Sequence, residues 1–98
     1  LRFIELARQA GLKWQLGAHV GETALLSAVG RAVALAHDDP IFVEGSIGEW
    51  LLVEDLSSPS VQFGEGGVAG ALAGPGLGVE GIEERVRKYA VDTRRLGG

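Results

Sequence analysis

Residues 16–31 read LGAHVGETALLSAVGR, and they contain the strongest structural signal in the chain. The first part is mostly apolar and ends at an acid, Glu22, with Gly21 directly before it. The second part begins at Thr23, is rich in alanine and leucine, and predicts a helix over residues 23–37. Thr23 is a suitable N-cap or first-turn residue for that helix. We therefore predict a buried strand that ends in a carboxylate and passes directly into a helix.

The flanking residues extend this order to helix, strand and helix. Residues 1–12 carry apolar side chains at helical spacing, which indicates an amphipathic helix, and Gly11 stands where a C-terminal glycine cap belongs. Residues 13–20 predict a short strand with apolar side chains at Trp14, Leu16, Ala18 and Val20. Such an order is typical of the end of a (β/α) barrel, in which catalytic groups lie at the carboxyl ends of the strands. We expect an α/β fold in which residues 1–37 supply the last barrel strand and its flanking helices.

The sequence pattern changes at Asp38-Asp39-Pro40. The features after it are a short apolar run at 41–43, a loop at 57–60, a possible hairpin strand at 61–63, a glycine-rich stretch at 64–78 and a helix at 82–89. We expect no further βα repeat here. Residues 38–98 instead form a C-terminal segment that packs on another domain, with Phe42 and Glu44 expected at the interface.

Composition excludes several classes of protein. Of the 98 residues, 46% are hydrophobic and 22% are charged, which argues against disorder, and the net charge of −4 without a basic patch argues against a nucleic-acid partner. The absence of cysteine excludes disulfides and thiolate metal sites. No apolar run is long enough to span a membrane and no signal peptide is visible, so we expect a cytoplasmic protein. The chain contains no methionine, and we expect it to be part of a larger protein.

Two stretches resemble a known family. GAHVGE at residues 17–22, which leads into LSAVGR at 26–31, is similar to a barrel strand, its terminal acid and the following helix in the enolase superfamily, in the branch of mandelate racemase and muconate lactonizing enzyme. GPGLGVE at residues 74–80 resembles the segment with which that family returns to its capping domain. EDL at residues 54–56 is similar to the linker before that return. The two stretches occur in the family's order, and the resemblance identifies the chain as the C-terminal portion of such an enzyme.

The resemblance implies Mg²⁺ held by carboxylates on earlier strands, and a lysine or histidine base that removes a proton α to a carboxylate. The reaction would be a racemisation, epimerisation, cycloisomerisation or dehydration of a small carboxylate substrate. Because those strands would precede Leu1, we expect this chain to bind no cofactor and to be inactive by itself. Its partners would be the remainder of the barrel or further copies in a homo-oligomer.

Glu22 and His19 are the candidate catalytic residues. Glu22 matches the acid that contacts the substrate or intermediate in the family, but it is equally suited to stabilise a helix N-terminus. His19 could donate to a substrate carboxylate or act as an acid or base, or it could be a structural histidine. A regular strand would point the two side chains to opposite faces, so both face one site only if Gly21 breaks the strand. A metal site made by this pair alone would lack ligands.

Two other functions are open. The chain could be a non-catalytic module that self-associates or binds a complementary chain, because an incomplete α/β unit exposes apolar surface. Glycines 74, 76 and 78 could also indicate a nucleotide-binding loop. The dinucleotide motif, however, needs a strand before the glycines and a helix directly after them, so we predict turns at residues 74–78.

Overall fold

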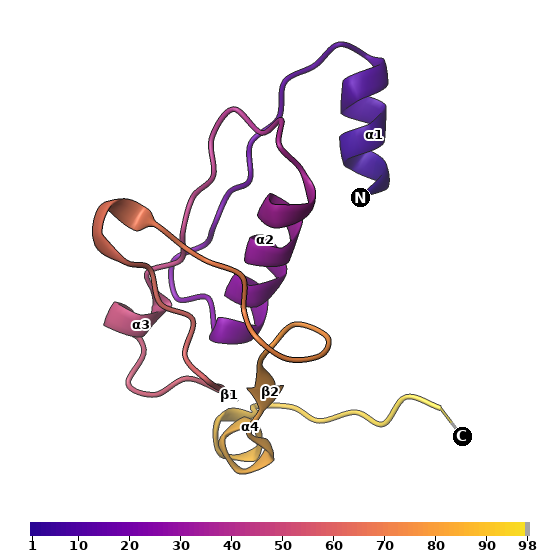
Figure 1. The fold of residues 1–98 in the computed structure, drawn as a ribbon. Helices are drawn as coiled ribbons and strands as arrows, with labels where there is room; N and C mark the ends of the chain where they lie inside the picture. The colour runs from indigo at the N-terminus through magenta and orange to yellow at the C-terminus, as the bar shows by residue number, and fades with distance from the viewer. Residues whose placement is uncertain (98) are drawn as a thin grey trace.

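The computed structural model describes residues 1–97. Its elements are α1 (Arg2–Gln9), α2 (Ala24–Ala36), α3 (Gly48–Leu51), β1 (Ser57–Ser58), the 3₁₀ helix η1 (Glu65–Gly67), β2 (Glu80–Gly81) and α4 (Glu83–Tyr89). Helix α2 lies in the middle of the molecule, with α1 near one end and α4 near the other (Figure 1). The helices predicted over residues 1–12, 23–37 and 82–89 are confirmed with slightly shorter bounds.

The N-terminal helix is joined to the chain after α2 by one polar cluster. Arg8 in α1 forms an ion pair with Asp39, and its Nε donates to the same carboxylate at 2.7 Å. The buried Trp14 donates from Nε1 to Asp39 at 3.0 Å. Gly11 ends the helix region with a φ of 67°, as the sequence pattern predicts. These contacts hold α1 against residues 37–39.

A parallel pairing connects residues 14–16 with residues 41–44. The main-chain N–H of Leu16 donates to Phe42 at 3.0 Å, and its carbonyl accepts from Glu44 at 2.9 Å. Leu16 and Val43 form a parallel bridge, and α2 supplies the connection between the two segments. Parallel segments joined through a helix make a βαβ arrangement, which we did not expect after residue 38. The boundary predicted between residues 37 and 38 therefore runs between segments that are hydrogen-bonded to each other.

The strand predicted over residues 13–20 is wrong in extent, because only Leu16 forms a β-bridge. The main-chain N–H of Ala18 donates to the side chain of Glu44 rather than to a neighbouring strand. Two residues later the chain turns, with Gly21 at a φ of 78°. The alternation of apolar residues predicted a longer ladder than these contacts permit.

The core is small and lies under the start of α2. Ala24 and Ala28 are buried against Val61, and Leu72 and Val79 pack on the same cluster. Gly30 faces residues 14–16: a Cβ there would lie 4.0 Å from the Leu16 side chain, in ordinary contact. The inner face of α2 therefore packs against both halves of the chain.

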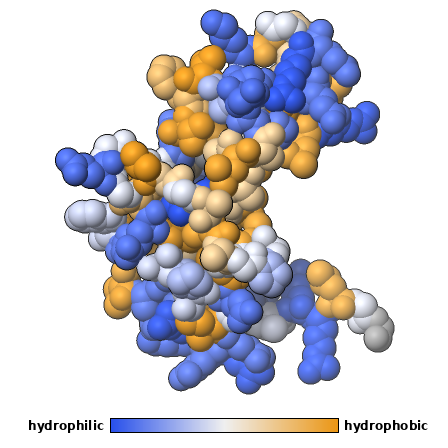
Figure 2. Space-filling view, viewed as in Figure 1, coloured by the Kyte–Doolittle hydropathy of each residue, from blue (hydrophilic) through white to orange (hydrophobic). Residues whose placement is uncertain are grey.

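The C-terminal segment returns through a short antiparallel pair, in which Ser57 lies opposite Gly81 and Ser58 opposite Glu80. Residues 61–63 form no strand, which corrects the possible hairpin. Residues 74–78 consist of turns, as predicted, and Gly78 donates to Pro75 at 3.2 Å. Many apolar side chains remain on the surface between the hydrophilic ends (Figure 2). Among residues 1–97, none of the helices has the length and apolar character needed to cross a membrane.

Candidate functional site

The chain makes a tight turn from His19 to Glu22. The main-chain N–H of Glu22 donates to the carbonyl of His19 at 3.3 Å, and Gly21 adopts the left-handed conformation that this turn requires. The Glu22 side chain folds back, so that Oε1 accepts from the main-chain N–H of His19 at 2.6 Å. No strand reaches this turn, so the alternation that would place His19 and Glu22 on opposite faces does not apply.

The two residues do share a cavity, which has a volume of about 260 Å³. His19 is exposed at its rim and Glu22 is half-buried. The other polar lining residues are Ser27, Ser46 and Glu44. The apolar ones include Leu16, Leu26, Val29 and Val33, which come from the parallel segment and from α2. The cavity thus lies where the parallel pair meets α2.

Glu44 brings a second carboxylate to this cavity. It follows the apolar residues 41–43, and its Oε2 accepts from the main-chain N–H of Ala18 at 3.1 Å. We expect Glu44 at a domain interface, and in the structure it lines this cavity. An acid directly after a short apolar run is the same signal that marked Glu22, so the sequence did contain the information.

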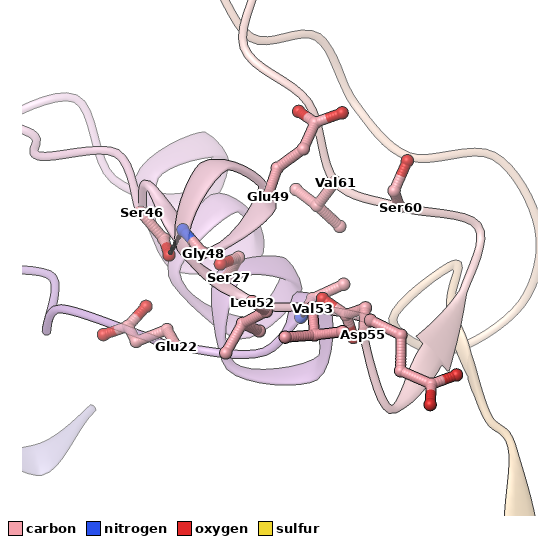
Figure 3. A pocket seen from close by; sticks show the side chains of 12 residues that line it. Glu22, Ser27, Ser46, Gly48, Glu49, Leu52, Val53, Asp55, Ser60 and Val61 are labelled. Carbon is pink, nitrogen blue, oxygen red and sulfur yellow. Dashed lines mark hydrogen bonds between the residues drawn. The ribbon is translucent and has the colours of Figure 1, made fainter. Parts of the chain in front are cut away.

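A smaller cavity, of about 180 Å³, is also bordered by Glu22 (Figure 3). Glu49 and Asp55 line it, together with Ser46 and Val61. Gly48 begins α3 with its Cα against the main chain of Glu22, where a Cβ would come within 1.9 Å of the Glu22 carbonyl oxygen. Ser46 Oγ accepts from the Gly48 N–H at 3.1 Å. The carbonyl of Glu22 therefore packs closely against the start of α3.

The carboxylate of Glu54 binds three side chains of helix α4. Glu54 forms ion pairs with Arg85, at 3.0 Å, and with Lys88, and it accepts from the Tyr89 hydroxyl at 2.7 Å. The hydrogen bonds from Lys88 and Tyr89 lower the pKa of the Glu54 carboxyl, and the bond to Glu54 raises the pKa of Lys88. Within residues 1–97 Glu54 forms no hydrogen bond or ion pair with His19 or Glu22, although it lines the 180 Å³ cavity that Glu22 borders.

The described residues do not fit a magnesium site. Within residues 1–97, no group of three or more His, Asp or Glu side chains could hold a metal ion. Oε1 of the Glu22 carboxylate already accepts a hydrogen bond from the main-chain N–H of His19. Mg²⁺ requires about six oxygen ligands in regular geometry.

No family model, curated protein or solved structure matches this chain. The 260 Å³ cavity brings together both residues that the sequence indicated, Glu22 and His19, and adds Glu44. Chemically, the cavity offers two carboxylates as hydrogen-bond acceptors and one imidazole beside an apolar wall.

Proposed function

We propose that this chain is the C-terminal part of a Mg²⁺-dependent enzyme of the enolase superfamily. The enzyme would abstract a proton α to the carboxylate of a small substrate, as a racemase, epimerase, cycloisomerase or dehydratase. One observation supports this most directly: the parallel segments joined by α2 lead to Glu22 and Glu44, and both glutamates line one cavity. Active sites of (β/α) barrels are built from groups at that end of the strands.

The hydrogen bonds of Glu22 suggest how it would act. Oε1 is occupied by the His19 N–H, whereas Oε2 accepts no hydrogen bond from residues 1–97. Oε2 would therefore accept a hydrogen bond from a substrate or intermediate. His19 would donate a hydrogen bond to a substrate carboxylate or exchange a proton with the substrate.

The metal ligands and the base would belong to strands that precede Leu1, as the resemblance implies. The chain by itself would then bind no cofactor and be inactive, and the remainder of the barrel would be its partner. We further propose that the enzyme is cytoplasmic. A small carboxylate would enter the cavity beside Glu22 and Glu44.

The test begins with the coding region upstream of Leu1, which should encode a lysine or histidine and spaced carboxylates at strand ends. The encoded polypeptide, given Mg²⁺ and a panel of carboxylates in D₂O, should incorporate deuterium at the α carbon, detected by proton NMR. Glu22→Gln should slow this exchange by roughly a hundredfold, the scale of one lost transition-state hydrogen bond. Glu65→Gln, an exposed acid outside the cavity, is the control.

Exchange catalysed by the isolated 98-residue chain would contradict the proposed location of the metal ligands. Absence of exchange with every carboxylate, in a polypeptide that has the expected upstream residues, would contradict the proposed reaction.

A second function is favoured by a different observation. Trp50 and Val53 expose 86% and 99% of their surface, and other large apolar side chains are exposed on α1 and after Pro40. Exposed apolar surface of this extent is typical of an interaction site. The chain could thus be a non-catalytic module that binds a complementary chain or another copy of itself. Deuterium exchange separates the two functions, because only the first requires it.

A further inference from the structure

The helix that follows Glu22 is capped by a distant side chain. Thr23 occupies the N-cap position of α2, as expected, but its side chain makes no capping hydrogen bond. Asp55 Oδ2 instead accepts from the main-chain N–H of Ala24 at 2.8 Å. Ala24 is the first residue of α2 and lies two residues after Glu22. A carboxylate at this place satisfies a free N–H and interacts favourably with the helix dipole.

Asp55 is itself held by contacts on its other side. Its Oδ1 accepts from both the N–H and the Oγ of Ser57, each at 3.0 Å, and Ser57 is buried. The Asp55 carbonyl accepts from Arg85 at 2.8 Å. The carboxylate therefore has little freedom to move. A fixed acceptor at Ala24 fixes the direction in which the chain enters α2.

The contacts around Glu22 transmit this constraint. Its carbonyl packs on Gly48 and its carboxylate closes the turn to His19. We expect a shift at Ala24 to move Glu22, because only Thr23 separates them and the carbonyl of Glu22 lies close to Gly48. The direction of the carboxylate in the cavity thus depends on Asp55.

We propose that Asp55 is a positioning residue for Glu22, through which the C-terminal segment controls the geometry of the cavity. Its catalytic consequence rests on the proposed function, but the positioning itself does not. Asp55 lines the 180 Å³ cavity but not the 260 Å³ cavity, and it reaches Glu22 through the start of α2.

The test compares hydrogen exchange at the His19 amide, the donor to Glu22, in the full chain. Asp55→Ala should make this amide exchange roughly five- to tenfold faster, the change expected for loss of one hydrogen bond. Asp55→Asn keeps one acceptor oxygen and should restore part of the protection. Asp92→Ala is the matched control: it removes an exposed aspartate that pairs with Arg94 on the tail after α4, and it should leave the exchange of the His19 amide unchanged.

Faster exchange at Ala24 with an unchanged His19 would overturn the proposal, because Asp55 would then only cap the helix. If circular dichroism shows that Asp55→Ala does not fold, hydrogen exchange at the Ala24 and His19 amides is measured in Asp55→Asn. Faster exchange at Ala24 alone would again overturn the proposal. In the longer polypeptide, Asp55→Asn should lower the rate of α-deuteration but add little to Glu22→Gln. Changed exchange at His19 without any deuteration activity would contradict the proposed function and leave the positioning intact.

Discussion

Gly48 has a packing role that its place at the start of a helix does not reveal. Helix propensity alone favours Gly48→Ala, by about 0.5–1 kcal/mol. A Cβ would, however, meet the carbonyl oxygen of Glu22 at 1.9 Å, and main chain cannot move aside as a flexible side chain can. We expect the variant to lose about 1–3 kcal/mol of unfolding free energy, the usual penalty of overpacking, in urea titrations.

Gly70→Ala is the matched control for Gly48, because a Cβ at Gly70 would meet nothing within 4 Å. Its stability should change by less than about 0.5 kcal/mol. Equal stability of the two variants would show that α3 does not pack on Glu22 as described.

Asp39 should make the stability of the chain depend on pH. Its hydrogen bonds from Arg8 and Trp14 hold its pKa far below the usual range in the folded state. A lowered folded pKa contributes stability above the unfolded pKa of about 3.9, and this contribution is lost as pH falls toward the folded pKa. The urea midpoint of the wild-type chain should therefore exceed that of Asp39→Asn at pH 7, and the difference should shrink below about pH 4. Solvent screening limits this contribution to stability, because the side chains of Arg8 and Asp39 are each more than a third exposed.

Asp38→Asn removes the adjacent carboxylate, which forms no ion pair within residues 1–97. The difference in urea midpoint between Asp38→Asn and the wild type should not shrink as the pH falls below about 4. A constant difference between the wild type and Asp39→Asn across the same range would exclude the Asp39 network as the source.

The candidate residues show what a sequence can indicate at this scale. Glu22 and His19 became candidates because they stand at the end of a mostly apolar segment that passes into a helix, and the structure places both at one cavity. The cap from Asp55 to Ala24 could not be found, because it joins positions 31 residues apart and Thr23 already offers a suitable N-cap side chain. Local preference predicted the residue type at the helix start but not the side chain that makes the bond.

Among the elements, α4 depends on a single side chain outside it. Glu54 binds Arg85, Lys88 and Tyr89, whereas α4 buries none of its own residues. A helix of seven residues is marginal without tertiary contacts. We expect Glu54→Ala to accelerate hydrogen exchange of the amides in the last turn of α4, including the Ala90 N–H that donates to Val86.

The control for Glu54 is Glu83→Gln, which removes the ion pair between Glu83 and Arg87 within α4. Both side chains are 77% exposed, so this pair should contribute little. Equal acceleration in the two variants would mean that the clamp by Glu54 does not stabilise the helix.

Elements with local contacts were more predictable than those with distant ones. Alanine and leucine spacing was sufficient to locate α2 within a residue at each end, because helical hydrogen bonds join near neighbours. The pairing of Leu16 with Val43 spans 27 residues and depends on α2 folding between them. The apolar run at residues 41–43 is too short to show the two-residue alternation of a strand. Its parallel pairing with residues 14–16 is therefore visible only in the structure.

At the scale of the whole molecule, the chain is more open than a domain of its length. Its radius of gyration is 15.4 Å, whereas about 13 Å is typical for 100 residues. None of its larger side chains in residues 1–97 is fully buried. Both proposed functions account for this, because a barrel fragment and an interaction module each require other surfaces to cover their apolar side chains.

We therefore expect the 98-residue chain to self-associate as its concentration rises, because burial of apolar surface stabilises assemblies by about 25 cal/mol per Å². Multi-angle light scattering should show the mean mass increasing with concentration at constant salt. A chain with Trp50→Glu and Val53→Glu should associate less, since both side chains are almost fully exposed. Val91→Glu, equally exposed but on the tail after α4, is the control for added charge. A monodisperse monomer at every concentration would show that this surface does not drive association, and that the open shape is compatible with an independent domain.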